Sequence, residues 1–120
     1  MKIHLQKEID NLKKKLFHLS TMVEESLEIA IRAIHTQDAA LAATVKGRDK
    51  EIDRLEAELE EDCLKILALH QPVAADLRFL ITALKMNNDL ERIGDLAVNI
   101  TTGKLCLTDD SSPPIFGEML

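Results

Sequence analysis

Aromatic side chains are nearly missing from this sequence of 120 residues: they make up 2% of it, and neither Trp nor Tyr occurs. Proteins that bind single-stranded nucleic acid stack the bases on aromatic rings, so this class is excluded. The net charge of −6 at pH 7 also has the wrong sign for a phosphate backbone or an anionic membrane surface. We therefore expect no nucleic-acid partner.

Cysteine is scarce as well. Cys63 and Cys106 are the only two, and neither belongs to a CxxC or Cys/His spacing of the kind found in structural zinc sites. No run approaches the roughly 20 apolar residues of a transmembrane helix, and the N-terminal stretch MKIHLQKEID lacks the apolar segment of a signal peptide. We expect a cytoplasmic protein with no segment inserted in a membrane.

Gly-rich loops, internal repeats and the alternating pattern of β-strands are also absent, and helical spacing dominates instead. Apolar residues recur every three or four positions over about residues 4–35, 49–70 and 73–105, which predicts three long helices. The longest apolar stripe belongs to the first of them: Leu5, Ile9, Leu12, Leu16, Leu19, Val23, Leu27, Ala30 and Ile34.

A short extra helix is predicted over residues 39–45, since Asp38 suits an N-cap and Gly47 suits a stop. Pro72 cannot continue the helix before it but suits the first turn of the next one. Short connections between long helices favour an all-α fold, an antiparallel three-helix bundle with this short extra helix.

The C-terminal stretch TDDSSPPIFGEML has the composition of a linker followed by a few apolar residues. We predict a bundle domain over residues 1–107 and a linker tail over 108–120, whose apolar end is interpreted as the start of a further unit.

Carboxylates occupy unexpected positions on two of the predicted helices. Asp49 and Asp53 lie one turn apart, as do Glu91 and Asp95, so the pattern (D/E)xxxD occurs twice. On antiparallel neighbours these pairs would face one groove and could bind a multivalent cation. Carboxylate oxygens suit iron(III), manganese, magnesium or calcium, and iron and zinc also accept them. Gly94, between two of the acids, would either permit close approach of the two helices or leave room beside a ligand. The acidic strip of the 49–70 helix comprises Asp49, Asp53, Glu56 and Glu60.

Three other interpretations of this pattern stay open at the level of spacing. The first is a solvated acidic edge, in which arginines such as Arg48, Arg54 and Arg92 pair with nearby carboxylates. The second is a metal-dependent carboxylate enzyme, although the Glu-x-x-His motif of ferritin-like di-iron proteins and any nucleophile–base pair are missing. The third is a purely structural helical oligomerisation module.

Two stretches resemble signatures of the PhoU family of phosphate-signalling proteins: GRDKEIDRLEAELEEDCLKILALHQPVAADLRFL and NDLERIGDLAVNI, with the first helix similar as well. The resemblance covers about residues 1–105. It implies a three-helix repeat, normally present twice, whose (D/E)xxxD motifs hold metal at positions that correspond here to Asp49, Asp53, Glu91 and Asp95.

The resemblance further implies a regulator that is not an enzyme. PhoU proteins act with a phosphate ABC transporter, including its ATPase, and with a sensor histidine kinase, and they usually self-associate. A single repeat is visible in this sequence. The resemblance therefore implies either that residues after 108 begin a second repeat or that the chain completes the arrangement as a homodimer.

Overall fold

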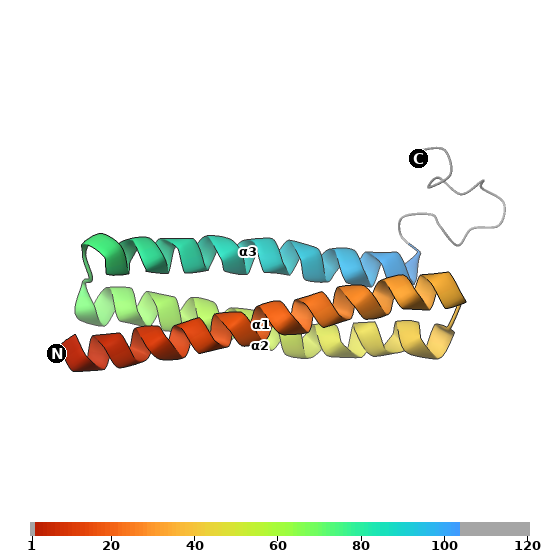
Figure 1. The fold of residues 1–120 in the computed structure, drawn as a ribbon, viewed down its shortest axis with the longest axis horizontal. Helices are drawn as coiled ribbons and strands as arrows, with labels where there is room; N and C mark the ends of the chain where they lie inside the picture. Colours follow the sequence, from red (N-terminus) through yellow and green to blue (C-terminus); the bar gives the residue numbers. More distant parts are fainter. Residues whose placement is uncertain (1, 104–120) are drawn as a thin grey trace.

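A computed structural model describes residues 2–103 of the chain. This part forms three helices, α1 (Lys2–Thr36), α2 (Ala39–His70) and α3 (Ala74–Thr102). They lie side by side with alternating directions in a rod of 61 × 27 × 16 Å, and each helix contacts both others (Figure 1). The predicted all-α, antiparallel three-helix bundle is confirmed.

The core runs along the axis of the rod and draws apolar side chains from all three helices. Its larger part is a cluster of buried residues: Leu12, Leu16, Leu19, Met22, Val23, Ile52, Leu59, Cys63, Ile66, Leu80 and Ala83. A smaller cluster of Ala30, Val45 and Ala97 lies toward the α1–α2 turn. The three-and-four spacing of apolar residues thus placed the buried faces of α1 and α2 correctly. On α3 the predicted stripe is wrong in part, because Ile81, Met86 and Ile93 are exposed. The buried residues of that helix are Leu80, Ala83, Asn87, Gly94 and Ala97.

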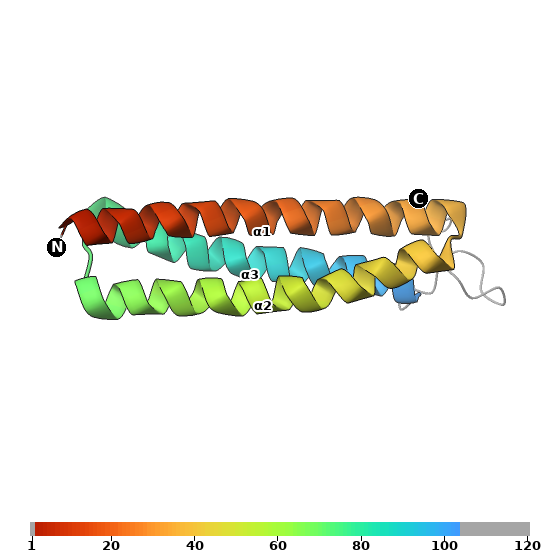
Figure 2. The ribbon, with the colours of Figure 1, turned by 90° about the horizontal axis from the view of Figure 1, so that it is seen from below.

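The prediction of a separate short helix over residues 39–45 is wrong. These residues are the first part of α2, which continues through Gly47 without a break. A glycine costs about 1 kcal/mol in a helix interior, a cost that burial of Val45 against α1 and α3 can offset. Figure 2 shows this half of α2 continuing toward the α1–α2 turn.

The helix ends follow local capping rules. Asp38 caps α2 as predicted, with its carboxylate accepting a hydrogen bond of 3.0 Å from the backbone N–H of Leu41. Gly103 closes α3 in the left-handed region at φ 73°. The start of α3 lacks such a cap, because the side chain of Val73 makes no capping hydrogen bond. The next residue, Ala74, has a left-handed φ of 54°.

Polar contacts hold α1 against α2 at three levels. Lys15 bonds to Glu58 and Asp62, Arg48 donates to the Ser26 hydroxyl at 3.0 Å, and His70 lies 2.6 Å from Glu8. Between α2 and α3 the side-chain hydrogen bond is a different one: Asn87 donates to the backbone carbonyl of Glu56 at 3.1 Å. The α1–α2 and α2–α3 contacts are therefore stabilised by different polar interactions.

Within residues 2–103, no helix is long and apolar enough to cross a membrane. The predicted end of the bundle domain at 107, the tail over 108–120 and Cys106 all lie outside the described residues. The domain boundary therefore stays a prediction.

Candidate metal centre

The four predicted ligands lie on two antiparallel helices that contact each other. Asp49 and Asp53 belong to α2, and Glu91 and Asp95 belong to α3. The closest approach described between them is at Gly94, where a Cβ would stand 3.8 Å from Oδ1 of Asp49. That separation is ordinary contact, so Gly94 leaves space beside Asp49 without being sterically required there.

The four carboxylates differ in how far they are buried. Asp49 is half-buried, whereas Asp53, Glu91 and Asp95 are exposed at the edge of the bundle. The carboxylates of α3 therefore lie beside the core rather than within it. We refer to Asp49, Asp53, Glu91 and Asp95 as the acidic groove.

The charges of the groove act on one another across the two helices. Burial raises the pKa of Asp49 above its ordinary value, and the charges of Asp53 and Asp95 raise it further. Asp95 lies on the facing helix, so the two (D/E)xxxD pairs are near enough to interact. Like charges gathered in this way favour either a proton or a cation.

Several buried oxygen atoms at this seam have no hydrogen-bond partner. They are Oδ1 of Asp49, both carboxyl oxygens of Glu56 and Oδ1 of Asn87. Buried polar atoms are almost always paired in folded proteins, so a group of such atoms calls for an explanation. Oxygen atoms from carboxylates and amides are the donor set that hard cations prefer, and the side chains of the groove fit such an ion by chemistry.

The arginines do not neutralise the groove. Arg48 pairs with Glu25 at 3.6 Å and Arg54 with Glu58 at 3.7 Å. No ion pair found among residues 2–103 includes any of the four groove carboxylates. The arginine pairs that the solvated-edge interpretation names are therefore not found at these four carboxylates, whereas the exposure of Asp53, Glu91 and Asp95 agrees with that interpretation.

The side chains of the groove are not gathered as ligands. In the described part of the chain, no three His, Cys, Asp or Glu side chains are arranged to hold a metal ion as they stand. Binding at the groove would require the exposed carboxylates to turn toward one point. Because Asp53, Glu91 and Asp95 are exposed, such rotation is open to them.

Glu56 belongs to this seam and was missed as a site residue. It is only 5% exposed, and its pKa is raised to about 8, first by burial and then by the charges of Asp53 and Glu91. The sequence placed Glu56 in the acidic strip of α2 without separating it from its exposed neighbours. The signal that distinguishes it is its place between Ile52 and Leu59, both of which are buried.

The remaining candidate residues lie elsewhere. His4, His18 and His35 are exposed, and His70 is bonded to Glu8 at the opposite end of the bundle from the α1–α2 turn. Cys63 is fully buried, and burial raises the pKa of its thiol to about 11, which makes it a core residue rather than a reactive one.

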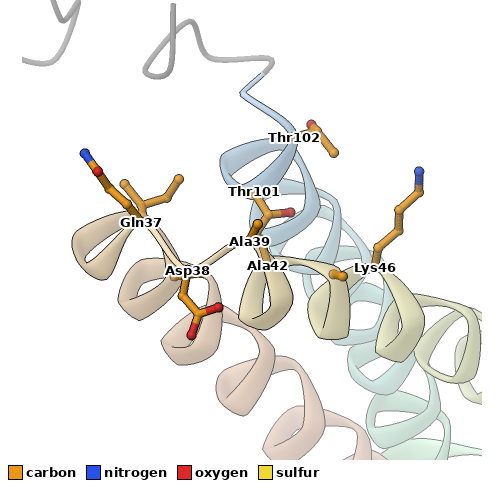
Figure 3. A pocket seen from close by; sticks show the side chains of 10 residues that line it. Gln37, Asp38, Ala39, Ala42, Lys46, Thr101 and Thr102 are labelled. Carbon is orange, nitrogen blue, oxygen red and sulfur yellow. The ribbon is translucent and has the colours of Figure 1, made fainter.

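A hollow of about 610 Å³ lies where the α1–α2 turn meets the end of α3 (Figure 3). Its wall is mainly small and apolar, with Lys46 and Asp38 as its charged residues. It does not contain any of the groove carboxylates. Nothing in its lining converges on one point as the polar groups of a ligand site do.

Comparison with known proteins gives a family match over most of the helical bundle. The family described as "PhoU domain" matches residues 16–102. That span includes all four groove carboxylates and Glu56.

Three curated relatives illustrate the similarity. The Thermotoga maritima "Phosphate-specific transport system accessory protein PhoU homolog 1" is 40% identical over 90% of this chain and 47% of its own length. The Aquifex aeolicus homolog is 36% identical over 92% of this chain and 49% of its own length. The Escherichia coli K12 PhoU protein is 38% identical over 84% of this chain and 40% of its own length. The chain thus spans about half the length of the curated relatives it matches.

Proposed function

The chain belongs to the PhoU domain family, and on that premise we propose that it is an accessory regulator of phosphate uptake and of phosphate-regulon signalling. The observation that carries the proposal is the match over residues 16–102 together with relatives named as accessory proteins of the phosphate-specific transport system. On this proposal the chain acts by binding other proteins in the cytoplasm and is not an enzyme.

Its proposed partners are the ATPase of a phosphate ABC transporter and a sensor histidine kinase. Large apolar side chains that remain exposed on the bundle supply surface for such contacts, since exposed apolar patches commonly mark protein interfaces. Phe17 on α1 and Leu69 on α2 are 75% and 69% exposed.

The regulatory proposal is tested in the source organism. Removing the coding sequence should raise phosphate uptake and switch on a phosphate-starvation reporter in medium rich in phosphate. Restoring the gene should return both to their original levels. A strain in which uptake and reporter stay unchanged after the deletion would contradict the proposal.

We also propose that Asp49, Asp53, Glu91 and Asp95 hold a multivalent metal ion, with iron or zinc favoured over manganese or magnesium. Support comes from the mutual effect of charges across α2 and α3, the unpartnered oxygen of Asp49 and the absence of arginine pairing in residues 2–103. A bound cation would supply positive charge between the two helices. The four side chains would orient it, and their mutual repulsion would fall.

The metal proposal predicts the metal content of the purified, untagged chain. Mass spectrometry should find stoichiometric metal in the wild type and none in Asp53→Asn/Asp95→Asn. The same double change should abolish any rise in melting temperature on adding the metal, since a ligand that binds only the folded state stabilises it. Without metal, the variant should melt no lower than the wild type, because like-charge repulsion is reduced. A wild type that contains no metal and takes up none when it is added would sink this proposal.

A measurement of catalytic turnover distinguishes a metal-dependent enzyme from a regulator. Metal-loaded chain should neither consume oxygen nor hydrolyse phosphate esters beyond the rate of the free metal. Turnover that disappears in Asp53→Asn/Asp95→Asn would favour the enzyme.

A further inference from the structure

We propose that Glu56 is a fifth carboxylate ligand of the acidic groove and binds the cation from the buried side. This inference rests on the metal site proposed above and adds a residue to it. It names the side chain that would connect the exposed groove to the interior of the α2·α3 seam.

The first support is burial without a partner. Glu56 is 5% exposed, and both of its carboxyl oxygens are inaccessible and make no hydrogen bond. A glutamate with a purely structural role at such a position would be expected to have a lysine, an arginine or a backbone N–H beside it. Cations lie near other carboxylates of the same helix instead: Lys15 and Arg54 both bond to Glu58.

The second support is proximity. The charges of Asp53, Glu91 and Asp49 all act on the carboxyl group of Glu56 and raise its pKa. These three neighbours come from both helices and are all members of the acidic groove. The buried carboxyl group of Glu56 therefore lies next to the groove.

The third support is the contact that keeps α3 against this position. Asn87 of α3 is buried and donates from Nδ2 to the backbone carbonyl of Glu56 at 3.1 Å. Its own Oδ1 has no partner. The inner wall of the groove thus presents three unpartnered oxygens from Glu56 and Asn87, with Oδ1 of Asp49 as a fourth.

Together these oxygens match the needs of a hard cation. An ion such as Mn²⁺ or Mg²⁺ takes six ligands in octahedral geometry, and exposed carboxylates alone would bind it from one side only. A carboxylate from the interior would complete the ligand set on the other side. It would also give the buried oxygens of Glu56 the partner that the helices do not provide.

The test compares cation binding by Glu56→Gln with binding by a matched control. Glu60→Gln removes the same charge from the same acidic strip one turn away, where the side chain is exposed. Mn²⁺ and Zn²⁺ are titrated into the full metal-free chain by calorimetry at pH 7. We expect Glu56→Gln to weaken binding by at least about tenfold, the scale on which removal of a residue supporting a metal site acts. Glu60→Gln should stay within about twofold of the wild type, a margin set by the small effect of exposed charges.

A second variant protects the test against a folding defect. Glu56→Asp keeps the charge and shortens its reach by one methylene, so a ligand role predicts weaker binding for it as well. Melting of the metal-free chains shows whether each variant is folded.

The outcomes separate this inference from the site it rests on. If the wild type binds the ion and both Glu56 variants bind it equally well, Glu56 is not a ligand and the four-carboxylate site stands. If Glu56→Gln and Glu60→Gln weaken binding equally, the loss of affinity comes from removing a negative charge near the groove and not from removing a ligand. The inference is then overturned. If the wild type binds neither ion, the metal site itself fails, and the inference fails with it.

Discussion

At the scale of single residues, Glu56 couples the stability of the metal-free bundle to pH. Its pKa is raised from 4.5 to about 8 in the folded chain. Between these values the folded state holds a proton that the unfolded state has lost. Stability therefore falls as pH rises through this interval. Asp49 acts in the same direction, because its pKa is also raised.

This pH dependence is measurable by urea unfolding in the presence of a chelator. The wild type should be more stable at pH 5 than at pH 8, and the difference should shrink in Glu56→Gln, which cannot ionise. The groups that act on Glu56 are Asp49 and Asp53 on α2 and Glu91 on α3, so Glu60→Gln again serves as the control. Equal slopes for the wild type and Glu56→Gln would contradict the assignment.

At the scale of elements, α2 carries a glycine that its helix does not need. A Cβ on Gly47 would meet nothing within 4 Å, and its φ is not in the left-handed region. Gly47→Ala should therefore stabilise the chain by up to about 1 kcal/mol, the difference in helix propensity between the two residues. Chemical unfolding at constant pH measures the change.

Gly103 provides the opposite case in the same chain. Its φ of 73° closes α3 in a conformation that side chains with a Cβ rarely adopt. Gly103→Ala should destabilise the chain while Gly47→Ala stabilises it. Two substitutions that shift stability in the same direction would show that helix propensity and end geometry do not govern these positions.

The same two glycines show how far the sequence could predict the fold. Periodicity identified the three long helices and the buried faces of α1 and α2, because a helix repeats every 3.6 residues whatever its context. It did not identify the buried face of α3, which includes Asn87 and Gly94. It misread Gly47 as a stop, because the choice between stopping and continuing depends on packing around Val45 that only the assembled bundle provides.

The acidic groove was predictable to a similar degree. Spacing placed Asp49 with Asp53 and Glu91 with Asp95 on two helices, and antiparallel packing brought those helices into contact. Spacing could not rank the acids of α2 by depth. Asp53 and Glu56 are three residues apart on the same strip, yet one is exposed and the other is buried. That difference is set by how α3 lies over α2, which Asn87 helps to fix.

At the scale of the whole molecule, helical spacing places several exposed apolar side chains along the side where α1 and α3 meet. Lys13 lies over the ring of Phe79, 5.3 Å from its centroid, which places these two positions beside each other. Helical spacing carries the α1 side on to Phe17 and Ile31, and the α3 side to Met86 and Ile93, all four of them exposed. A strip of this kind is suited to contact with a second copy of the bundle.

If this strip forms the interface of the homodimer that the family resemblance implies, a charge within the strip should separate the copies. Phe17→Glu is expected to shift the mass measured by light scattering from dimer toward monomer. His18→Glu places the same charge at the adjacent exposed position and should leave the mass unchanged. A wild type that is monomeric at high concentration would exclude the homodimer, and a dimer that survives Phe17→Glu would move the interface elsewhere.

The polar contacts between α1 and α2 differ from those between α2 and α3. This difference predicts which helix should detach first when the bundle opens. Ion pairs and hydrogen bonds connect α1 to α2 along its length. By contrast, α3 faces α2 across mutually repelling carboxylates. It also begins without a side-chain cap, at Ala74, whose φ is left-handed. We therefore expect opening of α3 to be the first large fluctuation of the metal-free rod. A cation in the groove would close that route. In this way the metal content of the cell would determine how often the buried face of α3 becomes accessible to another protein.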